Sequence, residues 1–82
     1  MFTKIRDVNR AMQSLYACGA GDHPFIVVSA VCSTFAHETY IFPADQDGNV
    51  TDWLELPGSL RGAMDHDRAL QGYREHVESG AA

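Results

Sequence analysis

The alternation of hydrophobic and polar residues predicts an amphipathic helix at the start of the chain. Between residues 3 and 17, apolar side chains recur at spacings of three and four, which is typical of one face of a helix. Thr3 is a suitable N-cap, and Gly19 and Gly21 follow the pattern as glycines do after a helix. Pro24 then prevents any continuation of the helix.

The middle of the chain predicts three strands. Residues 25–32 form a short run rich in β-branched side chains, with neither face strongly polar, so we expect a central strand covered on both faces. Residues 38–42 predict a second strand, and Pro43 marks its end or an edge position. Residues 50–56 predict the third strand, joined to the second by a turn at 45–49 whose Asp-Gly step is typical of a hairpin.

The last part of the chain predicts a loop and a second helix. Residues 61–64 are expected to form the loop. From Asp65 or Asp67 to about Glu78 the apolar residues again form one stripe, and both aspartates suit an N-cap or a first helical turn. The predicted fold is α+β: a small single domain over residues 1–82, in the order α-β-β-β-α, with a three-stranded antiparallel sheet and two helices.

Length and composition narrow the class of protein. The chain has 82 residues and a net charge of −5. So short a chain forms a single domain with a small core, which favours self-association. Its longest apolar run, residues 25–32, is far shorter than the roughly 20 residues of a membrane span. An acidic chain also lacks the excess of Lys and Arg that binds phosphates. We therefore expect no membrane and no direct nucleic-acid partner.

The N-terminal residues and the cysteines bear on the cellular compartment. The first residues lack the apolar core of a signal peptide, which predicts a cytoplasmic protein. Cys18 and Cys32 are therefore expected to be free thiols. Cys32 ends the apolar run, and we expect it to pack as a small buried hydrophobic residue.

No motif in the sequence predicts a metal site, a cofactor or catalysis. Asp45, Asp47 and Asn49 fit positions 1, 3 and 5 of a calcium loop, but Val50 replaces the required glycine and Leu56 replaces the bidentate glutamate. The histidines and cysteines lack the paired spacing of a zinc module. A phosphate-binding loop and a nucleophile elbow are also missing from the sequence. We therefore expect a protein that is not an enzyme and has no metal or cofactor.

The most informative feature of the sequence is the placement of charge. Residues 38–55 contain five carboxylates and no Lys or Arg, which equals the net charge of the whole chain. Aromatic residues lie between these acids, a composition typical of interaction hot spots, and an acidic surface attracts a basic partner. Two plainer explanations are solvated acids that protect a sheet edge and a Trp53 that anchors the core. The predicted partner-binding residues are Glu38, Tyr40, Asp45, Asp47, Asp52, Trp53 and Glu55.

The same region resembles a group of small uncharacterised proteins from bacteriophages and prophages. Glu38-Thr-Tyr-Ile-Phe is followed by Asp47-Gly-Asn-Val and then by Asp52-Trp-Leu-Glu-Leu, and the similarity extends over roughly residues 38–77. The resemblance implies a phage-type accessory protein in the cytoplasm of a bacterial host. Such proteins often block a host protein, and carboxylates on a rigid hairpin can occupy a Lys/Arg groove meant for phosphates.

These observations lead to one main hypothesis and several alternatives. The main hypothesis is a non-enzymatic binding module that inhibits a host defence effector, such as a CRISPR or restriction complex, by binding a basic nucleic-acid-handling protein. The first alternative is a structural or regulatory homo-oligomer, for example a homodimer with residues 25–32 against a second subunit. A ligand- or metal-binding domain is a further alternative. Direct nucleic-acid binding is the last, supported only by the net positive charge of residues 1–20.

Overall fold

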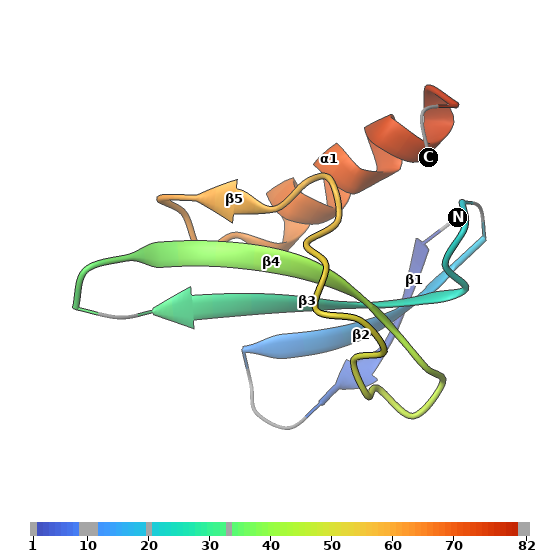
Figure 1. Cartoon of the computed structure of the whole chain (residues 1–82), viewed down its shortest axis with the longest axis horizontal. Helices are drawn as coiled ribbons and strands as arrows, with labels where there is room; N and C mark the ends of the chain where they lie inside the picture. Colours follow the sequence, from blue (N-terminus) through green and yellow to red (C-terminus); the bar gives the residue numbers. More distant parts are fainter. Residues whose placement is uncertain (1, 9–11, 20, 33, 81–82) are drawn as a thin grey trace.

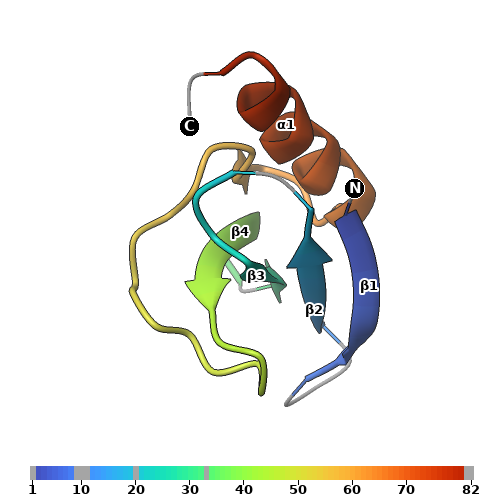
Figure 2. The same cartoon turned by 90° about the vertical axis from the view of Figure 1, so that its right-hand side faces the viewer.

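The protein is a single antiparallel sheet with one helix against it. The computed structural model describes residues 2–8, 12–19, 21–32 and 34–80. Each strand pairs with its sequence neighbour, which gives the sheet order β1-β2-β3-β4-β5 (Figure 1). Helix α1 lies across one side of the curved sheet (Figure 2) and packs on β3 and β4. The elements are β1 (Phe2–Asp7), β2 (Gln13–Cys18), β3 (Phe25–Cys32), β4 (His37–Ala44), β5 (Leu60–Arg61) and α1 (His66–Glu78).

The main core lies between the sheet and α1. Alternate residues of a strand point to opposite faces, so Ile26 and Val28 of β3 face the helix while Val27 faces away from it. The helix contributes Ala69, Leu70 and Tyr73, as its apolar stripe predicts. The buried residues of this core are Tyr16, Ile26, Val28, Ile41, Leu56, Ala69, Leu70 and Tyr73.

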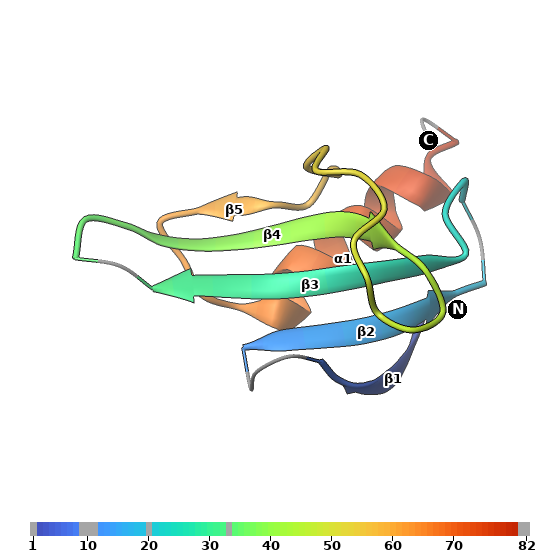
Figure 3. The ribbon, with the colours of Figure 1, turned by 60° about the horizontal axis from the view of Figure 1, so that its bottom comes forward.

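A smaller apolar cluster covers part of the opposite face. It contains Val8, Leu15, Val27 and Ala44, with Val50 packed against them. The chain after β4 crosses the sheet on this face, in front of the strands in Figure 3, while α1 lies behind them. Because both faces are covered here, β3 is the central buried strand that its apolar run predicts.

The predicted helix over residues 3–17 is wrong, since this segment forms the hairpin of β1 and β2; residues 9–11 lie outside the described part. Thr3, the expected N-cap, pairs with Ala17 inside that hairpin. The three-and-four spacing was coincidental: Leu15 and Tyr16 are buried on opposite faces of the sheet, and Ile5 is exposed. In the β2 strand, which pairs with β3, successive side chains point to opposite faces of the sheet, as in any strand, and not to one face as in a helix.

The predicted third strand over residues 50–56 is also wrong. This segment makes only an isolated bridge, between Ala44 and Val50. Thr51 N donates to Pro43 O over 3.0 Å, but Pro43 has no N–H with which to return the bond. The next bond to β4 comes from Leu56 N, which donates to Ile41 O over 2.8 Å. A regular ladder would place residue 53 opposite residue 41, so three extra residues bulge out of the edge.

The chain returns to the edge of β4 as β5, whose second residue, Arg61, belongs to the loop predicted at residues 61–64. Leu60 pairs with Thr39 and Arg61 with Glu38. The Asp-Gly turn at 45–49 forms, but it leads into the bulged segment instead of a hairpin strand. The acids predicted for a rigid hairpin therefore lie on β4 and on the segment that follows it.

Helix α1 and the strands β3 and β4 confirm the remaining predictions of structure. Asp65 is the N-cap, and its carboxylate accepts a hydrogen bond from Arg68 N over 3.0 Å. The Thr39 hydroxyl donates to Ala63 O and accepts from Asp65 N, which fixes the start of the helix to β4. The observed fold has five antiparallel strands and one helix, in place of the predicted three strands and two helices.

Gly58 lets the segment beside β4 touch the backbone of α1. A Cβ at this position would lie 2.5 Å from Ala69 O and 2.6 Å from Tyr73 N, and the φ angle of Gly58 is +103°. The contact is looser on the helix side, since a Cβ at Gly72 would lie 3.2 Å from Gly58 Cα. Gly58 is therefore the glycine that the close approach of helix and segment requires.

Replacement of Gly58 tests this contact. We expect Gly58→Ala to lower the free energy of unfolding by roughly 2–4 kcal/mol, because the methyl group meets helix backbone that cannot rotate away. The matched control is Gly62→Ala, at a φ of +87° with no atom within 4 Å of the added Cβ. The control should lose only about 1 kcal/mol for its backbone conformation. Urea denaturation measures both, and equal losses would contradict the contact.

Candidate protein-binding surface

Strand β4 presents alternate side chains on the face of the sheet opposite α1. Thr39 and Ile41 point towards the helix, where Ile41 joins the main core. The residues between them, Glu38, Tyr40 and Phe42, therefore lie on the other face. Two of the predicted partner-binding residues, Glu38 and Tyr40, are thus neighbours on one face.

Arg61 of β5 joins three of the residues on this face. Its Nη1 forms an ion pair with Glu38 and donates to the Tyr40 hydroxyl over 3.0 Å. Its Nη2 lies 3.2 Å from both carboxylate oxygens of Glu55. The guanidinium carbon also lies 5.5 Å from the centre of the Tyr40 ring, within the range of a cation–π contact. Arg61 was missed by the sequence analysis, because its partners are brought to it only by the register of β4 and β5.

A row of aromatic rings continues from Tyr40 along the same face. The rings of Tyr40 and Phe42 are stacked with centres 5.8 Å apart, and Phe42 and Trp53 make an edge-to-face contact with centres 5.3 Å apart. Trp53 belongs to the bulge beside β4 and is 76% exposed, so it is not an anchor of the core. Leu54 beside it is exposed as well. The bulge therefore places two large apolar side chains in solvent, one of them braced by Phe42.

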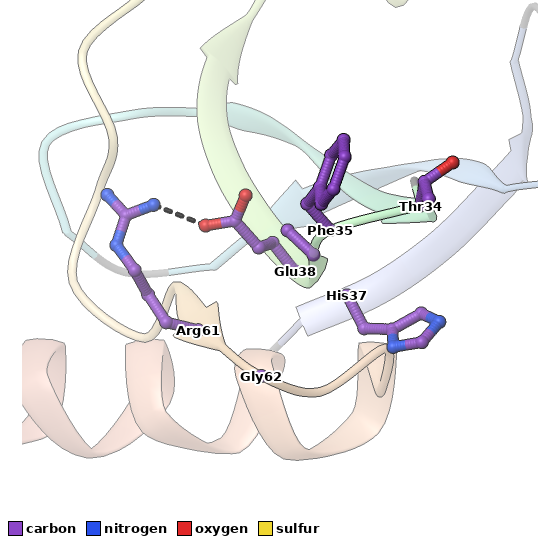
Figure 4. Close-up of a pocket in the computed structure, with 7 residues that line it drawn as sticks. Thr34, Phe35, His37, Glu38, Arg61 and Gly62 are labelled. Atoms are coloured by element: carbon purple, nitrogen blue, oxygen red, sulfur yellow. Dashed lines mark hydrogen bonds and ion pairs between the residues drawn. The ribbon is translucent and has the colours of Figure 1, made fainter.

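At the turn between β3 and β4, Phe35 is 96% exposed. An open hollow of about 390 Å³ lies at this turn, and Thr34, Phe35, His37, Glu38, Arg61 and Gly62 line it. Figure 4 shows the ion pair of Arg61 and Glu38 in the hollow, with His37 turned away from Glu38. We use the term β4 surface for Phe35, Glu38, Tyr40, Phe42, Asp52, Trp53, Leu54, Glu55 and Arg61.

Asp45 and Asp47 lie at the turn beyond the other end of β4. The Asp45 carboxylate accepts hydrogen bonds from Asp47 N over 2.9 Å and from Asn49 N over 3.0 Å. Asp47 accepts from Arg6 through its backbone carbonyl, which ties the turn to β1. Asp45 thus stabilises its own turn, because its carboxylate, at position 1 of the calcium-loop pattern, accepts from backbone N–H groups. Asp52 is exposed, and its carboxylate has no hydrogen bond or ion pair with a described residue.

The hydrogen bonds of this surface shift three acid–base equilibria. The Tyr40 hydroxyl and the Arg61 guanidinium lower the pKa of Glu38, so this carboxylate is ionised at neutral pH. The Glu38 carboxylate in turn raises the pKa of Tyr40, which keeps its proton. The backbone and side chain of Asn49 lower the pKa of Asp45.

Ser14, Asp7 and His66 meet elsewhere on the sheet, but not in the order of a hydrolytic triad. The Ser14 hydroxyl donates to Asp7 Oδ1 over 2.8 Å and lies 3.5 Å from His66 Nδ1, whose Nε2 lies 3.0 Å from Met12 O. A triad needs the histidine between serine and aspartate. Ser14 is also only 2% exposed. These contacts join β1 and β2 to the first turn of α1.

The described residues contain neither a cluster of metal-ligating side chains nor a helix that could span a membrane. Within residues 2–8, 12–19, 21–32 and 34–80, no three His, Cys, Asp or Glu side chains come together as metal ligands would. In the same ranges, no helix has the length and apolar character to cross a bilayer.

Both cysteines are free thiols, as predicted. The expected burial of Cys32 is wrong, because it lies exposed at the end of β3 where neither apolar cluster reaches. Cys18 is the more enclosed thiol, and burial raises its pKa to about 11.

Comparison with known proteins gives no relative: no family model, curated protein or solved structure matches the chain. The resemblance of residues 38–77 to phage accessory proteins stays a prediction.

The lowered pKa of Asp45 predicts how stability depends on pH. A carboxylate whose folded pKa lies below its unfolded value of about 3.9 stabilises the fold above that pH, and this stabilisation is lost as pH falls through the folded pKa. Asp45→Asn should therefore melt at a lower temperature than the natural protein at neutral pH, and the gap should close on acidification below about pH 4. Melting curves across this range measure the gap.

Asp52→Asn is the matched control for Asp45. It removes an acid from the same segment without removing a contact, so its melting temperature should follow the natural protein at every pH. The role of Asp45 is contradicted if the two variants behave alike.

The cysteines should differ sharply in reactivity. A thiol with a pKa of about 11 is on the order of 0.1% thiolate at pH 8, so half-buried Cys18 should react at least about 100-fold more slowly than exposed Cys32 with a disulfide reagent. Cys32→Ser should leave only the slow phase, and Cys18→Ser only the fast one. Two equal rates in the natural protein would rule out the protected environment of Cys18.

Proposed function

We propose that the protein is a non-enzymatic binding module that contacts a basic partner protein through the β4 surface. The observation that carries this proposal is Trp53, which is 76% exposed yet held by an edge contact with Phe42. An exposed aromatic side chain with a fixed orientation loses little conformational entropy when a partner covers it. Trp and Tyr are also the residues most often found at the energetic centre of protein interfaces.

The extent of the apolar surface supports the same proposal. Phe35, Trp53 and Leu54 are all exposed, and ring contacts join Trp53 to Phe42 and Phe42 to Tyr40. A contiguous exposed apolar surface with a polar rim is typical of an interaction site. The rim here consists of Glu38, Asp52, Glu55 and Arg61.

The charge of the region supports a basic partner. Arg61 pairs with Glu38 and Glu55, so these two acids are partly neutralised within the chain. Asp47 and Asp52 are exposed, and neither side chain forms an ion pair with a described residue. The region keeps a negative charge that would accelerate association with a positively charged protein.

The class of partner comes from the resemblance to phage accessory proteins. It points to a basic nucleic-acid-handling protein in the cytoplasm of a bacterial host, and to inhibition of a CRISPR or restriction effector as the biological role. Carboxylates and aromatic rings on one face of a small sheet could occupy a surface that otherwise binds phosphates and bases. This role needs no cofactor and no metal.

Substitution of Trp53 tests the proposal. The tagged protein is used to capture partners from a bacterial lysate, and each captured partner is purified and titrated against variants. Trp53→Ala should weaken binding about 30-fold or more, as expected for a central aromatic contact. Asp52→Lys should slow association, most strongly at low salt, because it reverses a steering charge.

The matched control is Ile5→Ala, which removes another exposed apolar side chain from the far edge of the sheet. It should bind as the natural protein does. A partner that binds Trp53→Ala and Asp52→Lys with unchanged affinity would refute the proposal. Capture of the chain by itself alone, with a dimer in light scattering that Trp53→Ala breaks, would instead favour the homo-oligomer.

A further inference from the structure

The β4 surface already holds one guanidinium group, that of its own Arg61. The two amino nitrogens of Arg61 serve different acids: Nη1 contacts Glu38 and the Tyr40 hydroxyl, and Nη2 contacts both oxygens of Glu55. The guanidinium carbon also lies 5.5 Å from the centre of the Tyr40 ring, within cation–π range. Only a planar cation with several fixed donors can make all these contacts together, whereas a lysine ammonium is a single point of charge.

The same chemical groups recur at the other end of the aromatic row without a cation. Trp53 offers an indole face, the aromatic surface that attracts cations most strongly, and it has no cation–π partner among the described residues. Asp52, its neighbour in the bulge, makes no ion pair in the described part of the chain. Glu55, at the end of the bulge, already pairs with Arg61, so Asp52 is the carboxylate left for a second cation.

We infer that the bulge of residues 52–55 binds arginine side chains of the partner and discriminates against lysine. The incoming guanidinium contacts the Trp53 ring and pairs with Asp52, as Arg61 contacts the Tyr40 ring and pairs with Glu38. This inference rests on the proposed function and adds the chemistry of the partner, an exposed arginine on a basic protein surface. Such arginines occur where proteins bind phosphate, which fits a nucleic-acid-handling partner.

Trp53 provides a direct test, because it is the single tryptophan of the chain. The natural protein is titrated with two peptides of equal length and charge, one of alternating Gly and Arg and one of alternating Gly and Lys, and Trp53 fluorescence is followed. The arginine peptide should bind at least about fivefold more tightly, because only its guanidinium both stacks and pairs. Equal affinities, or binding of neither peptide, would overturn the inference.

Variants assign the preference to the bulge. Trp53→Leu keeps an apolar side chain but removes the ring, and calorimetry should show that the arginine preference disappears. Asp52→Asn should weaken both peptides, with the larger loss for arginine. Ile5→Ala, which changes an exposed apolar side chain of β1 outside the β4 surface, is the control and should keep the full preference. A preference that survives Trp53→Leu would overturn the inference.

The test also separates this inference from the proposed function. If Trp53→Ala weakens binding of a captured partner but the two peptides bind equally, the surface binds protein without recognising arginine. In that case only the inference fails. If the peptides show the arginine preference but no partner depends on Trp53, the site recognises guanidinium groups and the proposed function fails.

Discussion

The outer edge of β4 needs hydrogen-bond partners, and the way it obtains them shapes the rest of the molecule. Thr51, Leu56 and Gly62 donate to the backbone carbonyls of Pro43, Ile41 and His37 in turn, and the Ser59 hydroxyl accepts from Ile41 N. No single regular strand makes these bonds, because the segment leaves the edge and returns to it. Where the segment first leaves the edge of β4 it forms the bulge with Trp53. Where it leaves a second time it brings Gly58 against α1.

This arrangement links binding to stability through one short stretch of chain. The covering segment touches the helix at Gly58, contributes Leu56 to the main core and carries Arg61, which organises the acids of the β4 surface. The bulge is flanked by two backbone hydrogen bonds to β4, which Thr51 N and Leu56 N donate. Substitutions within the bulge should therefore affect recognition, whereas substitutions at its ends should affect the fold.

Elements with a strong local pattern could be predicted from the sequence, and those that depend on pairing could not. The β-branched run of β3 and the capped apolar stripe of α1 need no distant partner to be recognised. Residues 3–17 fit a helical spacing by coincidence, and only their pairing with β3 makes them strands. Pro43 could likewise be read from the sequence. That the chain bulges beside it and exposes Trp53 depends on how residues 51–56 pair with β4, which no local pattern predicts.

The candidate surface was predicted in part for the same reason. Glu38, Tyr40, Trp53 and Glu55 do gather on one face, since alternation along β4 and the bulge beside it bring them together. Asp45 instead caps a turn. Arg61 lies outside the acidic segment 38–55, so the charge pattern did not predict its ion pair with Glu38. The bulge has a consequence for evolution: its two ends are fixed by backbone atoms, so its side chains and its length can vary without disturbing the sheet. In the proposed binding role, replacement of the four bulge residues would change the target while the scaffold stays the same.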